Sequence, residues 1–143
     1  MIRAILIAVS SLPLPGAACC GRIPGYTFAN RNRAGQIPPE GSVGHLYKLA
    51  RASGVTAVID AAAVPYLDGA REAAVAGYIS GGTRRILDWV APHTRFAGSL
   101  SETEWLLLAG AQTSGGLLVA GEIPGAPLIG ELIPRGTHVL DVR

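Results

Sequence analysis

Residues 43–60, with the sequence VGHLYKLARASGVTAVID, decide the fold class of this chain. Apolar side chains recur from Val43 to Ala50 at the spacing of one helix face. Gly54 stands where a glycine commonly ends a helix. The residues that follow, 55–59, are apolar or β-branched without interruption, which is typical of a buried strand. The stretch therefore predicts a helix followed closely by a central strand.

Further helices and strands follow without a regular repeat. Ser101 and Glu104 match a capping box, in which the serine and the glutamate satisfy backbone N–H groups at the start of a helix. The mixture of elements predicts the α+β class. The other expected elements are a helix over residues 66–76 that Gly77 ends, a loop at Gly81 and Gly82, strands over 115–120, 128–133 and 138–142, and a hairpin turn at 134–136.

Composition places the chain among single-domain globular proteins. It has 143 residues, of which 49% are hydrophobic and 15% are charged, so it can bury a core and is not disordered by composition. The formal net charge is +2, which is too small to favour nucleic acid or an anionic membrane surface. We therefore expect neither nucleic acid nor a membrane as a partner.

Residues 1–40 have no coherent period and are expected to form an irregular leader to a domain over residues 41–143. A basic start, a short apolar run and small residues before Cys19 have the outline of a secretory signal. The alternative is an unstructured leader of non-native origin, with a cytoplasmic protein behind it. Cys19 and Cys20 are adjacent and are the two cysteines of the chain, which excludes a disulfide framework and a cysteine-type zinc site.

The stretch QTSGGLL at residues 112–118 has the composition of an anion cradle. Gln112, Thr113 and Ser114 supply polar side chains and backbone N–H groups. Gly115 and Gly116 permit positive φ and a close approach of the backbone. Such a loop can hold a phosphate through its N–H groups. The alternative is a tight turn that only packs a strand against a helix.

Three segments in order resemble the C-terminal domain of selenophosphate synthetases, also called selenide, water dikinases. They are GHLYKLARASGV at residues 44–55, ISGGTRR at 79–85 and QTSGGLL at 112–118. The resemblance covers residues 41–143. It implies a truncated C-terminal domain of the aminoimidazole-ribonucleotide-synthetase-like type, with a mixed sheet and helices packed on one face.

The resemblance also implies a chemistry. Members of the family use ATP and magnesium to convert selenide to selenophosphate, with AMP and phosphate as the other products. A separate N-terminal domain binds ATP and forms the dimer. The positions of this chain that the resemblance implies to face substrate or phosphate are His45, Arg84, Arg85, Gln112, Thr113, Ser114, Gly115 and Gly116.

Several positions depart from the family pattern. Residues 37–42 read IPPEGS where family members usually have DVTGFG, whose aspartate binds metal. Ile86 replaces an asparagine, and Gly110 replaces an aspartate. The reactive cysteine and lysine of the family have no matching position here. We therefore assign no catalytic residue and no metal ligand, and we expect this chain alone to bind no cofactor.

Each singled-out side chain also has a purely structural interpretation. His45 can act as a helix cap or a packed side chain, and Arg84 with Arg85 can be a solvated pair. Trp89 and Trp105 are expected in the core. Asp60 and Asp68 are isolated carboxylates at the ends of elements.

Three functional hypotheses result. The first is a truncated selenophosphate synthetase that is inactive alone because the ATP-binding half is absent. The second is a non-catalytic binding module that completes a separately encoded ATP-binding half, with a homodimer formed through that half. The third is an exported small protein that reuses the fold.

Overall fold

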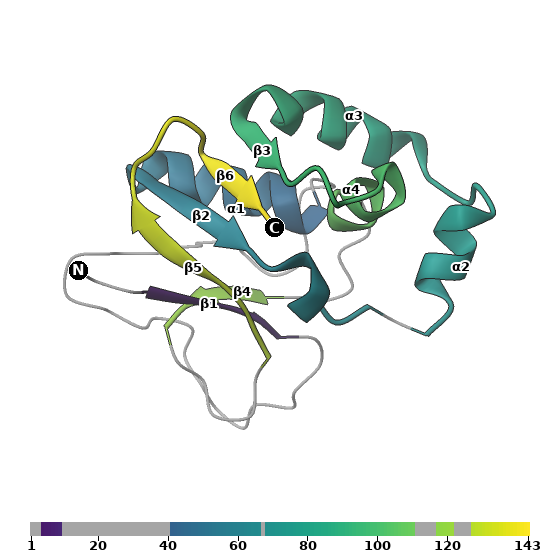
Figure 1. Ribbon diagram of the computed structural model, residues 1–143, viewed down its shortest axis with the longest axis horizontal. Helices are drawn as coiled ribbons and strands as arrows, with labels where there is room; N and C mark the ends of the chain where they lie inside the picture. The colour runs from purple at the N-terminus through teal and green to yellow at the C-terminus, as the bar shows by residue number, and fades with distance from the viewer. Residues whose placement is uncertain (1–3, 10–40, 67, 111–116, 122–126) are drawn as a thin grey trace, which may run out of the picture.

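The computed structural model describes residues 4–9, 41–66, 68–110, 117–121 and 127–143 (Figure 1). These residues form a six-stranded mixed sheet with helices. The strands are β1 (Ala4–Val9), β2 (Val55–Ile59), β3 (Thr94–Phe96), β4 (Leu117–Ala120), β5 (Leu128–Pro134) and β6 (Leu140–Val142). The helices are α1 (Gly41–Ala52), α2 (Ala70–Val75), α3 (Gly81–Val90) and α4 (Glu102–Leu108), with 3₁₀ turns η1 (Ala61–Ala63) and η2 (Ala91–His93).

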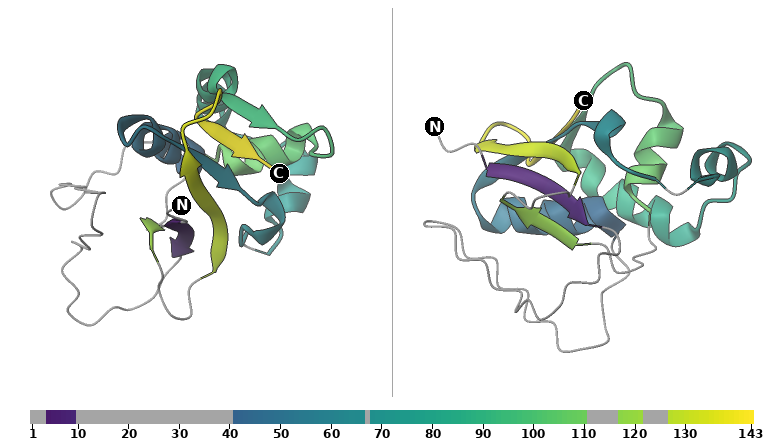
Figure 2. Two further views of the ribbon diagram at one scale, coloured as in Figure 1. Left: turned by 60° about the vertical axis from the view of Figure 1, so that its left-hand side comes forward. Right: turned by 90° about the horizontal axis from the view of Figure 1, so that it is seen from below.

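The sheet has the strand order β3-β6-β2-β5-β1-β4. β2 pairs antiparallel with β5 and parallel with β6, and β6 pairs parallel with β3. All five residues of β2 are buried, as expected for a strand near the middle of a sheet. Helices α1, α3 and α4 lie on one side of the sheet, and α2 lies beyond its end (Figures 1 and 2). The predicted α+β class, with a mixed sheet and helices on one face, is confirmed.

The core lies between this helix layer and the sheet. α1 contributes Leu46 and Tyr47, each 2% exposed, and Leu140 of β6 is fully buried. Gly54 adopts a φ of 65° directly after α1, the left-handed conformation that a glycine adopts without strain. The predicted helix, its glycine stop and the strand behind it are therefore all present.

Strand β1 was not predicted from the sequence, which indicated only an irregular leader there. Ala4–Val9 pairs antiparallel with β4 on one side and with β5 on the other. In the described part of the chain, β4 joins the sheet through β1. A short apolar run without alternation cannot be assigned to strand, helix or signal from its period. The boundary at residue 40 stays a prediction.

The hairpin predicted between the last two strands is wrong. β5 and β6 are not neighbours, because β2 lies between them. Thr56 of β2 holds the connection: its Oγ1 accepts from Gly136 N at 2.9 Å and donates to His138 O at 2.6 Å. Strand β5 does end at the predicted turn, at Pro134. The hydrogen bonds of Thr56 then hold residues 136–138 where the chain passes across β2 to its other neighbour, β6.

The loop predicted at Gly81 and Gly82 is also wrong, since both residues form the first turn of α3. Ser80 caps this helix, and its Oγ accepts from Thr83 N at 3.2 Å. Glycine is a weak helix former, and a side-chain cap at the start of the helix offsets part of its unfavourable helix propensity. Ile86 and Val90 of α3 are buried, and this tertiary packing overrides the local preference.

The capping box at α4 is confirmed. Ser101 Oγ accepts from Glu104 N at 3.3 Å, and Glu104 Oε2 accepts from Ser101 N at 3.2 Å. The helix predicted over 66–76 is shorter than expected, because α2 covers Ala70–Val75 only. Asp60 caps the 3₁₀ turn η1, where its Oδ1 accepts from Ala62 N at 3.1 Å. Gly77, with a φ of 88°, follows α2 as predicted.

Gly130 permits the close contact between β5 and β2. A Cβ at this position would lie 2.0 Å from Val58 O, well inside van der Waals contact. Residue 130 pairs with Ile59 in the register of the two strands. The absence of a side chain at Gly130 therefore lets these two strands approach closely.

Among the described residues, no helix has the length and apolar character needed to cross a bilayer.

Candidate functional site

The predicted phosphate-facing residues fall on three parts of the chain. His45 lies in α1 and is half-buried, while Arg84 and Arg85 lie in the first two turns of α3 and are exposed. α1 and α3 pack against each other through Tyr47 and Trp89, whose ring centroids are 5.0 Å apart. The structure thus brings the two helices together.

The two arginines point in different directions along α3. Arg84 Nη1 lies 3.8 Å from Glu102 Oε1 at the start of α4, and both side chains are largely exposed. Arg85 Nη1 lies over the first turn of its own helix, 3.6 Å from where a Cβ on Gly81 would stand. The exposed ion pair of Arg84 is of a kind that contributes little to stability.

The remaining predicted residues, Gln112, Thr113, Ser114, Gly115 and Gly116, lie outside the described residues. Their strand, however, was predicted correctly in kind, since β4 begins at Leu117. The cradle itself, and its distance from His45 or the arginines, stays a prediction.

A polar cleft that was not predicted lies between η1 and α2. Its volume is about 340 Å³, and it is lined by Ala62, Val64, Tyr66, Asp68, Gly69, Arg71 and Glu72. Arg71 organises it: its guanidinium carbon lies 5.1 Å from the centre of the Tyr66 ring. Arg71 Nη1 also donates to Glu104 Oε1 at 3.1 Å. Residues 71 and 104 are far apart in sequence, so no local pattern indicates this pair.

Electrostatics in the cleft follow from burial and from this ion pair. Burial raises the pKa of Tyr66 to about 12, against the opposing charge of Arg71. The Arg71 hydrogen bond, helped by the Ser101 backbone, lowers the pKa of Glu104. At neutral pH the cleft therefore presents a phenol O–H that can donate, beside the exposed side chains of Asp68 and Glu72.

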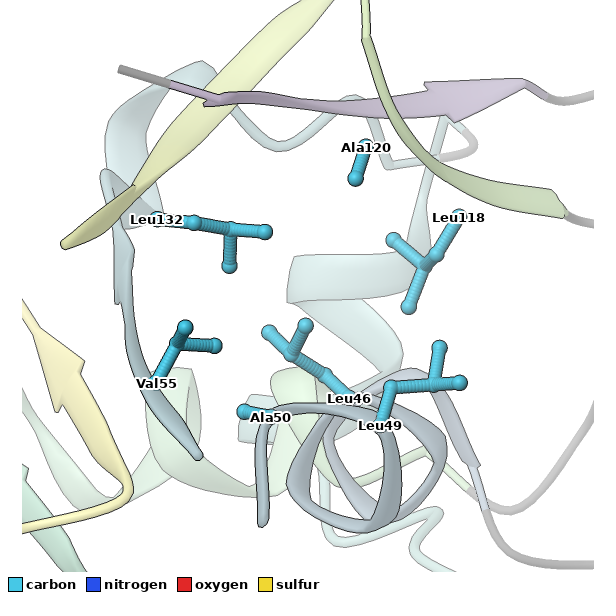
Figure 3. A pocket seen from close by; sticks show the side chains of 7 residues that line it. All are labelled: Leu46, Leu49, Ala50, Val55, Leu118, Ala120 and Leu132. Atoms are coloured by element: carbon cyan, nitrogen blue, oxygen red, sulfur yellow. The ribbon is translucent and has the colours of Figure 1, made fainter. Parts of the chain in front are cut away.

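A second cavity lies between α1 and the sheet (Figure 3). Its volume is about 10 Å³, and it is lined by Leu46, Leu49, Ala50, Val55, Leu118, Ala120 and Leu132. Leu and Val side chains from α1, β2, β4 and β5 point into it (Figure 3). A space of this size, lined by apolar side chains, holds at most one water molecule, so it is a packing gap and no ligand site.

The open face of the sheet carries a charged row. Asp141 of β6 is 7% exposed. Its Oδ1 accepts from Arg95 Nε at 3.1 Å, its Oδ2 accepts from Arg95 Nη2, and its Oδ2 accepts from Arg143 Nη2 at 3.3 Å. The side chains of both arginines are more than half exposed. This cluster stabilises the sheet edge and was not predicted.

Trp89 and Trp105 were both expected in the core. Trp105 stacks on Phe96 with ring centroids 4.7 Å apart, and its buried Nε1 has no hydrogen-bond partner among the described residues. Trp89 is 41% exposed, so that prediction is wrong. Trp105 packs against Phe96 of β3. Trp89 lies at the outer edge of the contact between α1 and α3.

The described residues contain no group of three or more His, Cys, Asp or Glu side chains that could hold a metal ion.

The fold and the motifs together define an α+β domain, and comparison with known proteins gives its relatives. No family model matches the chain. The selenide, water dikinase of Photobacterium profundum is 35% identical over 105 residues, covering 71% of this chain and 30% of that protein. The protein of the same name from Pseudomonas putida is 39% identical over 116 residues, covering 71% and 33%. That from Colwellia psychrerythraea is 42% identical over 78 residues, covering 54% and 22%.

The chain is therefore related to the selenide, water dikinases over these residues, which confirms the resemblance predicted from its motifs. It spans about a third or less of the length of these relatives. A match to one part of each relative is consistent with the C-terminal portion that the motifs indicate.

Proposed function

We propose that residues 41–143 act as the C-terminal domain of a selenophosphate synthetase and do not form selenophosphate by themselves. One observation carries this proposal: similarity to the dikinases extends over about a third or less of their length. The departures at residues 37–42 and at Gly110 support it, because the family places metal-binding and other carboxylates there.

In the complete enzyme this domain would supply positive groups and backbone donors to the phosphates. Arg84 and Arg85 are exposed at the first turns of α3, and guanidinium groups bind phosphate oxygens through paired N–H donors. His45 lies on the neighbouring helix. Magnesium and ATP would be bound by the ATP-binding half, with this domain closing over them.

The direct test is the family reaction with the purified chain. The chain is incubated with ATP, magnesium and selenide, and AMP is measured against a reaction without protein. We expect no selenide-dependent AMP. Turnover that scales with protein concentration would overturn the proposal.

A second function, a binding module for a separately encoded ATP-binding half, is favoured by one surface feature. Val75, the last residue of α2, is 76% exposed, and Tyr78, three residues after it, is 82% exposed. Large apolar side chains that stand out this far are candidates for contact with another protein. Co-expression with an ATP-binding half should give one complex on size exclusion, and two separate peaks would contradict this function.

A further inference from the structure

One surface on the helix layer combines aromatic rings with positive charge. We call it the cation–aromatic surface and define it by Tyr47, Lys48, Arg51, Trp89 and His93. Tyr47 is its buried centre, in edge contact with Trp89 and stacked on His93, each at 5.0 Å between ring centroids. Lys48 Nζ lies 5.6 Å from the Trp89 ring centre, and Arg51 Nη1 donates to the Tyr47 hydroxyl at 3.2 Å.

These contacts hold the surface in one arrangement. Arg51 also lies over the Tyr47 ring, at 5.9 Å from its centre. Cation–π contacts and ring stacking order long side chains before any partner arrives. A partner therefore loses less conformational entropy on binding here than on a surface of mobile lysines and arginines.

The charge of α1 is one-sided, because this helix carries Lys48 and Arg51 and no Asp or Glu. The other helices of the layer are mixed, with Arg84, Arg85 and Asp88 on α3 and with Glu102 and Glu104 on α4. The local positive charge of α1 attracts an acidic partner.

The side-chain types of the surface favour a protein partner. Trp, Tyr and Arg are the side chains enriched where proteins bind one another. Trp89, at 41% exposure, offers an apolar contact beside the charge of Lys48.

We propose that the cation–aromatic surface docks an acidic segment of a partner protein. Carboxylates of the segment pair with Lys48 and Arg51, and one apolar side chain of the segment packs on Trp89. This proposal does not depend on the family reaction, so it can fail or succeed independently of the proposed function.

The probe is a short synthetic peptide of glutamates around a central leucine, titrated into the full chain. Trp89 reports binding by its fluorescence in a Trp105→Phe background, because the chain has only two tryptophans. We expect saturable binding that weakens as salt is added, since exposed ion pairs are screened. The double variant Lys48→Gln, Arg51→Gln should bind the peptide about tenfold more weakly, and calorimetry measures this affinity.

The matched control is Arg84→Gln with Arg85→Gln, which removes the same charge from α3 and leaves Lys48 and Arg51 in place. Circular dichroism checks that both double variants fold. Retained binding in this control, with loss in the first variant, supports the proposal. Equal loss in both would show attraction to net charge alone and overturn it. Absence of saturable binding, or tighter binding of a single-stranded oligonucleotide than of the peptide, would also overturn it.

Discussion

At the scale of single residues, Asp141 is the buried charge on which the open face of the sheet depends. Burial works to raise the pKa of this carboxyl, but the hydrogen bonds and charge of Arg95, then those of Arg143, outweigh it and hold the pKa below its ordinary value. A lowered folded-state pKa gives stability above the unfolded-state pKa of about 3.9, which is lost as the pH falls through the folded-state pKa.

Replacing Asp141 by Asn should therefore change the acid dependence of stability. We expect a loss of about 1–3 kcal/mol near neutral pH, because two guanidinium groups lose a charged acceptor. Below the pKa of Asp141 the loss should shrink. Urea unfolding at a series of pH values measures it, and Asp88→Asn, at an exposed carboxylate, is the control. An equal loss at all pH values would contradict the proposed role of charge.

Gly130 tests the close approach of β5 and β2. A methyl group there would meet Val58 O at 2.0 Å, so Gly130→Ala must move one strand or the other. We expect a loss above about 2 kcal/mol in the free energy of unfolding. Gly98→Ala, where the added Cβ meets nothing within 4 Å, should be nearly neutral. Similar thermal midpoints for the two variants would show that the strands are less closely paired.

At the scale of elements, the capping box of α4 is a local interaction that can be removed cleanly. Ser101→Ala deletes the acceptor for Glu104 N, and we expect a loss of about 1 kcal/mol. Ser99→Ala, in the turn before the helix, is the matched control. Denaturant midpoints compare them, and no difference between the two variants would contradict the capping role.

A substitution in β1 tests whether this strand stabilises the sheet. Its backbone pairs with strands on both sides, so Leu6→Pro removes a ladder donor and restricts the backbone between β4 and β5. We expect a loss of about 3 kcal/mol or more. Leu6→Val keeps the N–H and should fold. An unchanged unfolding curve for the proline variant would show that the strand is dispensable.

The elements that could be predicted from sequence are those fixed by local signals. Gly54 ends α1, Ser101 caps α4 and the uninterrupted run 55–59 forms the central strand. The hairpin at 134–136 failed because neighbour order in a sheet depends on contacts such as that of Thr56 with residues far away in sequence. Strand β1 could not be predicted, because its short apolar run has no period that distinguishes a strand from a helix or a signal segment.

At the scale of the whole molecule, the family was predictable and the site only in part. Three ordered motifs named the relatives that the comparisons found. The exposed positions of Arg84 and Arg85 agree with a role toward a ligand, but that role stays a prediction, as does the cradle at 112–116. The cleft around Tyr66 could not be predicted, because Arg71 and Glu104 meet only in the folded chain.

We expect this domain to act only together with an ATP-binding half. The most direct measurement is selenide-dependent AMP formation by the chain alone, by an ATP-binding half alone and by the two together. We expect AMP above background only in the mixture. AMP formed by the chain alone, or a mixture no more active than the ATP-binding half, would contradict the claim.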